Sequence, residues 1–154
     1  MEESWGTRLA RWGFNLFPAY RGTGGRIAHI SANWHEIGIR LPLNWRTRNY
    51  VGSIFGGSIY GAVDPIYMIM FIKILGPEYI VWDKAATIRF IKPGRSTLFA
   101  HFYLSPDDVQ GIRDALKAEP KLERDFQVEV VDERGEIHAT VEKTLYFRHR
   151  GSLP

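Results

Sequence analysis

Residues 54–75, IFGGSIYGAVDPIYMIMFIKIL, constrain the fold of this chain more than any other segment. The segment is apolar almost throughout, yet it carries Asp64 and Pro65 near its middle. About 20 apolar residues can cross a bilayer, but a central aspartate costs roughly 2.5–3.5 kcal/mol there. The alternative is a helix buried inside a protein, which is also apolar all round. We expect a buried helix that bends between Gly61 and Pro65, because proline removes a backbone donor.

Alternating apolar and polar residues predict strands on both sides of this helix. These strands cover residues 26–34, 36–43, 80–92, 96–104, 126–131 and 136–147. Another helix is expected from Ser105, where a serine cap precedes a proline and two aspartates. Strands joined mostly by tight turns form an antiparallel sheet, and residues 54–75 are apolar enough to fill its concave face. The predicted fold class is α+β, with an antiparallel sheet wrapped around one long central helix.

Four large apolar side chains recur at helical spacing near the start of the chain: Trp5, Leu9, Trp12 and Leu16. Arg8 and Arg11 lie on other faces, so this segment is predicted to be a short basic amphipathic helix. We expect it to pack on the domain or on a partner subunit, and a membrane-surface helix is the alternative. We assign residues 1–25 to this helix and the loop after it, and residues 26–150 to a single domain.

The composition limits the classes of function. The chain has 154 residues, of which 45% are hydrophobic and 24% charged, as is ordinary for one soluble domain. Its net charge of +3 suits an anionic small ligand as readily as nucleic acid. Because there is no cysteine, disulfides, thiolate metal sites and cysteine nucleophiles are excluded. The five histidines lack metal-ligand spacing, so no metal is expected. The first residues lack the apolar region of a signal peptide, which predicts a cytoplasmic protein.

The start of the apolar helix offers groups suited to thioester chemistry. Gly56 and Gly57 leave backbone N–H groups unpaired at the positive end of the helix dipole, and glycine lets a ligand approach them closely. Such donors stabilise the oxyanion of a tetrahedral intermediate. Asp64, two turns further, could act as a general base on water or attack the carbonyl itself, and Asn49 could orient either partner. On a purely structural interpretation, the glycines allow tight packing and Asp64 neutralises a group at an interface.

The spacing of five residues resembles the signature of the hotdog-fold acyl-CoA thioesterases: Asn49, Gly52, Gly56, Gly57 and Asp64. It is most similar to the phenylacetyl-CoA and 4-hydroxybenzoyl-CoA type, whose motif reads N-x-x-G-x-x-H-G-G before a helix with Asp or Glu. Phe55 stands where that family has histidine, and Pro65 directly after the acid is a second departure. Residues 82–95 also resemble the strand and the proline-containing turn that follow in the family.

The resemblance implies a hotdog fold and hydrolysis of an acyl-CoA, with coenzyme A entering as part of the substrate and no separate cofactor. It implies a homodimer, or a dimer of dimers, in which Asp64 faces the glycine end and Asn49 of the other subunit. Gly56 and Phe55 would contact the substrate. Five basic residues would meet the phosphates of coenzyme A: Arg46, Arg48, Lys84, Lys92 and Arg95.

Three other functions remain open at this point. A non-catalytic hotdog domain that binds acyl-CoA or fatty acyl chains is favoured by Phe55. A hydratase or dehydratase would need a histidine near the acid, and residues 54–75 contain none. The segment NWRTRNY mixes aromatic residues with arginines, as single-stranded nucleic acid binders do, but no nucleic-acid motif accompanies it.

Overall fold

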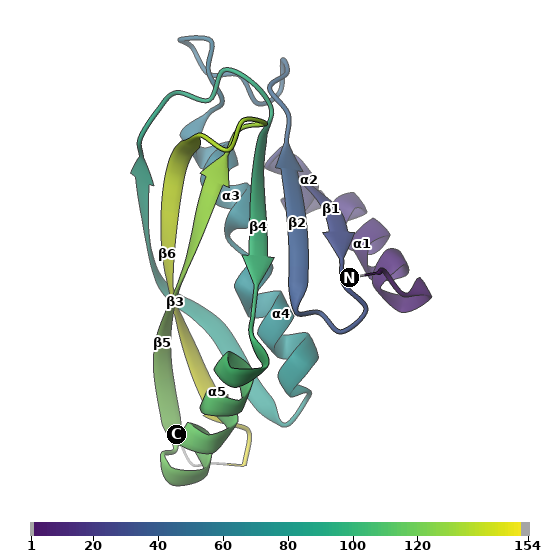
Figure 1. The fold of residues 1–154 in the computed structure, drawn as a ribbon, viewed down its shortest axis with the longest axis vertical. Helices are drawn as coiled ribbons and strands as arrows, with labels where there is room; N and C mark the ends of the chain where they lie inside the picture. Colours follow the sequence, from purple (N-terminus) through teal and green to yellow (C-terminus); the bar gives the residue numbers. More distant parts are fainter. Residues whose placement is uncertain (1, 152–154) are drawn as a thin grey trace.

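The computed structural model of the chain describes residues 2–151. Its elements, in chain order, are α1 (Trp5–Leu16), α2 (Pro18–Gly22), β1 (Arg26–Ile30), β2 (Glu36–Leu41), α3 (Gly56–Val63), α4 (Ile66–Leu75), β3 (Tyr79–Phe90), β4 (Leu98–Tyr103), α5 (Pro106–Ala118), β5 (Lys121–Val131) and β6 (Ile137–His149). The strands form one six-stranded antiparallel sheet in the order β1-β2-β4-β5-β6-β3 (Figure 1).

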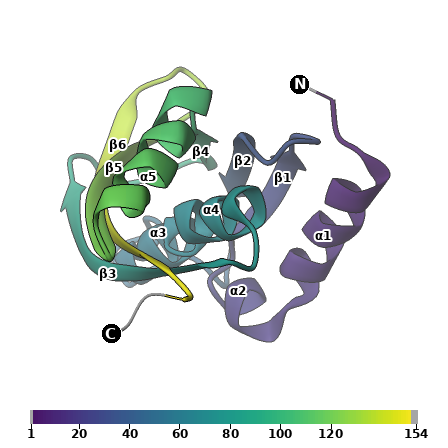
Figure 2. The same cartoon turned by 90° about the horizontal axis from the view of Figure 1, so that it is seen from below.

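The sheet curves around α3 and α4, as the end-on view in Figure 2 shows. Ile66, Met70 and Phe71 are fully buried against it. Residues Gly56–Leu75 are long and apolar enough to cross a membrane, with a mean hydropathy of 1.4, but half of that window is buried inside the domain. The predicted fold, an antiparallel sheet wrapped around a central helix, is therefore confirmed.

The central helix is interrupted where the sequence predicts a bend. Helix α3 ends at Val63 and α4 begins at Ile66. The interruption falls at Asp64 and Pro65 because proline has no N–H to continue the helical ladder. This break places a carboxylate at a helix junction in the middle of the domain.

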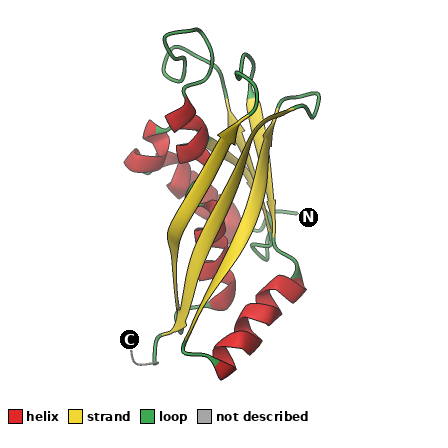
Figure 3. Cartoon of the chain, turned by 90° about the vertical axis from the view of Figure 1, so that its left-hand side faces the viewer, coloured by secondary structure: helices red, strands yellow, loops and turns green. Residues whose placement is uncertain are grey.

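The inner face of the sheet carries the alternating residues expected of a half-buried strand. Leu98, Ala100 and Phe102 of β4 are at most 3% exposed. Helix α5 lies at one end of the sheet (Figure 3), where Arg113 donates a hydrogen bond to the carbonyl oxygen of Ile74 in α4 (2.9 Å). Strand β5 begins at Lys121, five residues earlier than predicted, because its first residues also pair with β6.

Strand β3 lies at the edge of the sheet, and most of its residues are exposed. Its pattern correctly predicts a strand, but of the 12 residues of β3, all of them described, only Val81 is buried. Ala86 and Phe90 are exposed, and Phe90 has 57% of its surface accessible. A long edge with open backbone groups and apolar side chains is a surface on which another strand can pair.

Helix α1 packs on the domain with the face opposite to the expected one. The Asn15 side chain bonds both the N–H and the carbonyl of Ile27 in β1 (2.8 and 2.9 Å). Glu3, just before the helix, accepts hydrogen bonds from Arg11 (2.7 Å) and from the N–H of Ile30 (3.1 Å). The apolar stripe, defined as Trp5, Leu9, Trp12 and Leu16, is instead 62–76% exposed. The helix itself is as predicted, whereas the division at residue 25 stays a prediction.

Candidate functional site

The N-terminal end of α3 presents two free backbone donors. Phe55 is its N-cap and makes no side-chain capping bond. Among residues 2–151, no acceptor lies on the N–H groups of Gly56 or Gly57. The partial positive charge of the helix end is therefore available at this point.

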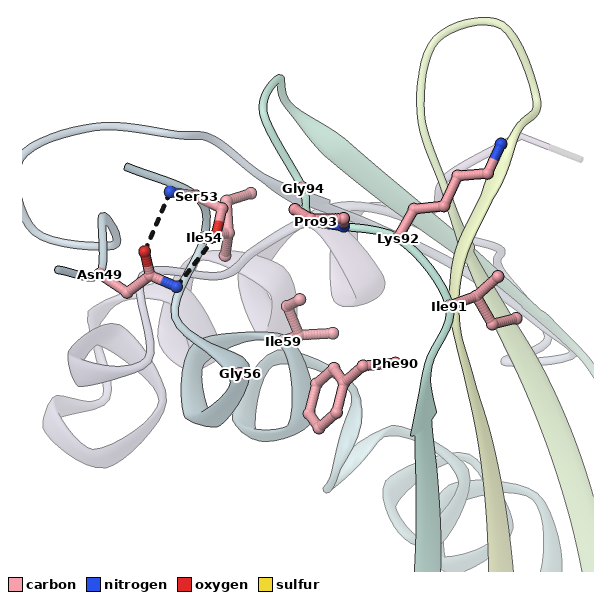
Figure 4. A pocket seen from close by; sticks show the side chains of 10 residues that line it. All are labelled: Asn49, Ser53, Ile54, Gly56, Ile59, Phe90, Ile91, Lys92, Pro93 and Gly94. Atoms are coloured by element: carbon pink, nitrogen blue, oxygen red, sulfur yellow. Dashed lines mark hydrogen bonds between the residues drawn. The ribbon is translucent and has the colours of Figure 1, made fainter. Parts of the chain in front are cut away.

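A cavity of about 410 Å³ opens beside this helix end (Figure 4). It brings together Asn49, Gly56 and Lys92, three of the residues predicted for the site. Phe90 from β3 forms another part of its wall, so close to Gly56 that a Cβ there would lie 2.9 Å from the ring. Glycine is thus required at position 56 unless the Phe90 ring moves.

Asn49 fixes the shape of its own loop. Its Oδ1 accepts hydrogen bonds from the N–H groups of Val51 (3.1 Å) and Ser53 (3.0 Å), and its Nδ2 donates to Ser53 Oγ (2.9 Å; Figure 4). The loop ends at Phe55, whose N–H donates to the carbonyl of Thr47 (2.7 Å). The side chain therefore holds the segment that leads into α3. A direct role in orienting water or substrate stays a prediction.

Asp64 is part of a charged cluster that the sequence analysis did not predict. Its Oδ1 accepts hydrogen bonds from Lys143 Nζ (2.5 Å) and from the Tyr60 hydroxyl (2.6 Å). The same ammonium also forms an ion pair with Asp83, at 3.2 Å from its Oδ1. The Lys143 side chain is 1% exposed, whereas Asp64 is 41% exposed. Asp64 is thus ion-paired rather than surrounded by apolar groups alone.

The cluster keeps a positive charge inside the domain. Burial alone lowers the pKa of Lys143, but the hydrogen bond with Asp64 and the charges of Asp83 and Asp64 outweigh it, so its pKa is raised. Burial also raises the pKa of Asp83, and burial and the bond to Asp64 raise the pKa of Tyr60. Lys143 therefore stays an ammonium, and Tyr60 stays a neutral donor, at neutral pH.

A sequence signal for Lys143 does exist. Strand β6 alternates, and its buried face holds Val141, Leu145 and Phe147. Lys143 falls in the same phase, between the first two of these. A lysine in the buried phase of a strand needs a counter-ion, and the aspartate of the central helix supplies it.

Asp64 and the free amides do not meet within one protomer. Gly56 and Asp64 are eight residues apart, which corresponds to roughly 12 Å along a helix. Asp64 lines a different cavity, together with residues of α1, α2 and α4. One carbonyl cannot contact both groups of the same chain.

The five predicted basic residues lie in different surroundings. Lys92 pairs with Glu136, and Lys84 pairs with Glu123 and lines another cavity with Tyr60 and Lys143. Arg46 lies over the ring of Trp45. Arg46, Arg48 and Arg95 are exposed. The arginines are therefore free to meet an anionic ligand, while the two lysines would have to exchange a carboxylate for it.

Within the part of the chain that the structure describes, one group of side chains has the spacing of metal ligands: Asp132, Glu136 and His138. Each already has protein partners. His138 contacts Pro93 O (3.2 Å) and Asp132 Oδ2 (3.4 Å), and Lys92 pairs with Glu136. The two hydrogen bonds from the N–H groups of Arg134 and Glu136 to Asp132 are those of a hairpin turn. The group is explained as part of the β5–β6 hairpin.

Phe55 covers part of the helix end. A Cβ on Gly57 would collide with the Phe55 ring, and this ring is 57% exposed. The ring lies beside the second of the two free amides.

Comparison with known proteins identifies both a family and a fold. Residues 6–147 match the family described as DUF4442, a domain of unknown function. A search of curated proteins gave no match.

Solved structures from three bacteria are similar over most of their length. A Pseudomonas aeruginosa protein of unknown function, described as a probable thioesterase, is 18% identical over 94% of this chain and 96% of its own, with a TM-score of 0.82. A Haemophilus influenzae thioesterase is 16% identical over 89% and 87%, with a TM-score of 0.66. A Chlorobaculum tepidum protein of unknown function is 11% identical over 94% and 94%, with a TM-score of 0.74. At these identities the likeness shows the fold, which is the hotdog fold.

Proposed function

The chain belongs to the DUF4442 family, and from its hotdog fold and its helix-borne carboxylate we propose that it is a thioesterase that hydrolyses an acyl-CoA at a site shared by two subunits. The observation that carries this proposal is the state of Asp64. One of its oxygens is held by Lys143 and Tyr60. Among residues 2–151, no hydrogen-bond donor lies on the other oxygen. A fixed carboxylate with one free oxygen is suited to receive a proton from water.

The reaction follows from these groups. Water, with Asp64 accepting its proton, attacks the thioester carbonyl, and the oxyanion that forms is stabilised by the N–H groups at a helix start. When the C–S bond breaks, the sulfur leaves as a thiolate and takes up the proton from Asp64. The products are a carboxylic acid and the thiol of coenzyme A. Attack by Asp64 itself, through an anhydride, is the other route that the same geometry supports.

In a dimer, the second subunit would supply the free amides that Asp64 cannot reach in its own chain. The distance of roughly 12 Å along the helix separates Asp64 from Gly56 and Gly57 of its own chain. A second protomer that pairs along β3 would bring its own helix start toward Asp64. The open apolar edge of β3 supports this arrangement, because such an edge is a site for strand pairing. We further propose that the thioester is hydrolysed in the cytoplasm.

A non-catalytic acyl-CoA binder is the second candidate. It is favoured by Phe55, which stands where related thioesterases carry histidine and lies against Gly57. If the ring stays in place in the complex, the second amide is closed to an oxyanion. Binding would then occur without hydrolysis.

Hydrolysis of a panel of acyl-CoA thioesters tests the proposal. The panel runs from acetyl through long-chain to aromatic acyl groups, and it is assayed with the wild-type protein and with Asp64→Asn. We expect turnover of at least one member by the wild type and a loss of at least a hundredfold in Asp64→Asn. Tight binding of acyl-CoA without any turnover would establish the second candidate instead.

Mixed dimers test whether the site is shared. Asp64→Ala and Asn49→Ala subunits, each inactive alone, are mixed in equal amounts after partial unfolding. Half of the dimers are then mixed, and each regains one of its two sites, so about a quarter of the wild-type activity should return. No recovery in a sample that demonstrably contains mixed dimers would rule out the shared site.

A further inference from the structure

A cavity of about 310 Å³ lies between the N-terminal helices and the central helix. Its walls include Phe14, Phe17 and Tyr20 from the α1–α2 side and Met68 and Ile69 from α4. The hydroxyl of Tyr20 donates a hydrogen bond to the carbonyl of Ala62 (3.0 Å), so the polar group of this side chain already has a partner. The cavity is therefore suited to an apolar occupant.

One end of this cavity is charged. Among the described residues that line the cavity, Asp64 is the one with a charged side chain at neutral pH. Asp64 and Asp83 carry two negative charges against the one positive charge of Lys143. This net negative charge would repel an occupant that ended in a carboxylate. A neutral carbonyl has no net charge and would not be repelled in this way.

We propose that this cavity binds the acyl chain of a neutral thioester, with the carbonyl at Asp64 and the chain between α1–α2 and α4. The assignment rests on the proposed function, and it makes the N-terminal helices a wall of the substrate site. It also explains how the product leaves. Hydrolysis turns the neutral carbonyl into a carboxylate, which is repelled by the carboxylate of Asp64.

The volume of the cavity sets the length of the chain. A cavity of about 150 Å³ accepts the six carbons of benzene, so 310 Å³ accepts roughly twelve carbons. Phe17 is 59% exposed and lies at the edge of the cavity, where the chain could enter. Met68 is flexible enough to adapt to chains of different shape.

Binding of unreactive analogues tests the site without requiring hydrolysis. The probes are S-(2-oxoalkyl)-CoA thioethers with chains of four to sixteen carbons, and their dissociation constants are measured by calorimetry. In the wild type, affinity should rise up to about fourfold per added carbon, from about 0.8 kcal/mol per buried methylene, and level off near twelve. Ala19→Phe places a six-carbon ring in the cavity from an exposed position of α2, so the plateau should fall to roughly six carbons.

Ala118→Phe, at an exposed position of α5, is the matched control and should leave the plateau unchanged. Met68→Ala should raise it, which keeps the test decisive if Ala19→Phe does not fold. An identical plateau in the wild type and in the folded cavity variants would overturn the proposal, even if thioesters are hydrolysed. A plateau that shifts as expected, in a protein that hydrolyses no thioester, would support the cavity and reject the proposed function.

Decanoate and decan-2-one test the charged end. We expect the neutral ketone to bind at least tenfold more tightly than the carboxylate of equal length. Equal or tighter binding of decanoate would overturn the assignment of the polar end to a neutral carbonyl.

Discussion

Lys143 is the residue on which most of the candidate site depends. Its ammonium is buried and lies between the carboxylates of Asp64 and Asp83. A buried cation is tolerated only when it is paired and hydrogen-bonded. The ion pair between Lys143 and Asp64 therefore has a structural role, because it neutralises Lys143. It also has a positional role, because it fixes one oxygen of Asp64.

Lys143→Met should destabilise the protein strongly. The substitution keeps the volume of the side chain but leaves Asp64 and Asp83 without a counter-ion. Removing one partner of a buried pair costs about 3–5 kcal/mol, and because both aspartates are partly hydrated we expect about 2–4 kcal/mol. Urea unfolding gives the value. Lys84→Met, which breaks an exposed pair with Glu123, is the control and should cost below about 1 kcal/mol. Equal losses of unfolding free energy in Lys143→Met and Lys84→Met would show that the burial of Lys143 does not matter.

Arg95→Glu should weaken the binding of coenzyme A. We expect coenzyme A to raise the melting temperature, because a ligand bound by the folded state stabilises it. Arg95 is exposed and directly follows Gly94 of the cavity at the start of α3. Thermal shift measurements should show a smaller rise for Arg95→Glu than for Arg124→Glu, an exposed arginine on β5. The same rise in both variants would place the phosphates elsewhere.

The sequence predicts some site residues and not others, for physical reasons. Gly56, Gly57 and Asp64 can be selected as candidates because their residue types are unusual inside an apolar run. The burial of Lys143 can be predicted from the phase of its strand, but its partner cannot, because Asp64 is 79 residues away and no local pattern connects a strand lysine to a helix aspartate. Which oxygen of Asp64 is free depends on that same distant contact.

At the scale of elements, helix α1 is the clearest departure from expectation. An amphipathic pattern reports that two faces differ, but not which face the domain covers. Here specific polar bonds decide, between the Asn15 side chain and the backbone of Ile27 and between the Glu3 carboxylate and the N–H of Ile30. The same limit applies to β3, whose alternation predicts a strand but not whether a neighbour covers it.

Substituting the apolar stripe should leave the stability of the protomer unchanged. Trp5→Gln, Leu9→Gln and Trp12→Gln alter side chains that are 62–76% exposed, so each should change the free energy of unfolding by no more than about 0.5 kcal/mol. Phe14→Ala, on the packed face, should cost about 2–4 kcal/mol. Denaturant unfolding compares the two groups. A cost above about 2 kcal/mol for the stripe variants would mean that another subunit covers the stripe.

Glu3→Gln should loosen α1 in a pH-dependent way. The hydrogen bond from Arg11 holds the pKa of Glu3 below its ordinary value of 4.5. A carboxylate with a lowered pKa stabilises the fold above its unfolded pKa, and this contribution is lost as the pH falls through the folded pKa. The difference in unfolding free energy between wild type and Glu3→Gln should therefore be present at pH 7 and should shrink below about pH 4.5. A difference that is independent of pH would contradict this.

At the scale of the whole molecule, the edge of the sheet formed by β3 is open to pairing with a strand of another subunit. Because β3 is long and its outer half is exposed, we expect two sheets to pair along it. Ala86→Asp would place like charges where the two edges meet, and sedimentation should show a shift from dimer to monomer, with loss of thioester hydrolysis. Ala118→Asp on α5 should leave the dimer intact. A dimer that persists in Ala86→Asp would place the interface elsewhere.

The ion pair between the central helix and β6 also governs how the chain folds. Until α3 and α4 dock, Lys143 on the inner face of the sheet lacks its hydrogen-bond partner Asp64 and has only Asp83 of the neighbouring strand β3 as a counter-ion. A compact sheet without its helix is therefore a high-energy state. Helix docking and completion of the sheet must occur together, across a sequence separation of 79 residues. We expect slow folding for a chain of this size and a single cooperative transition in which no half-assembled domain accumulates.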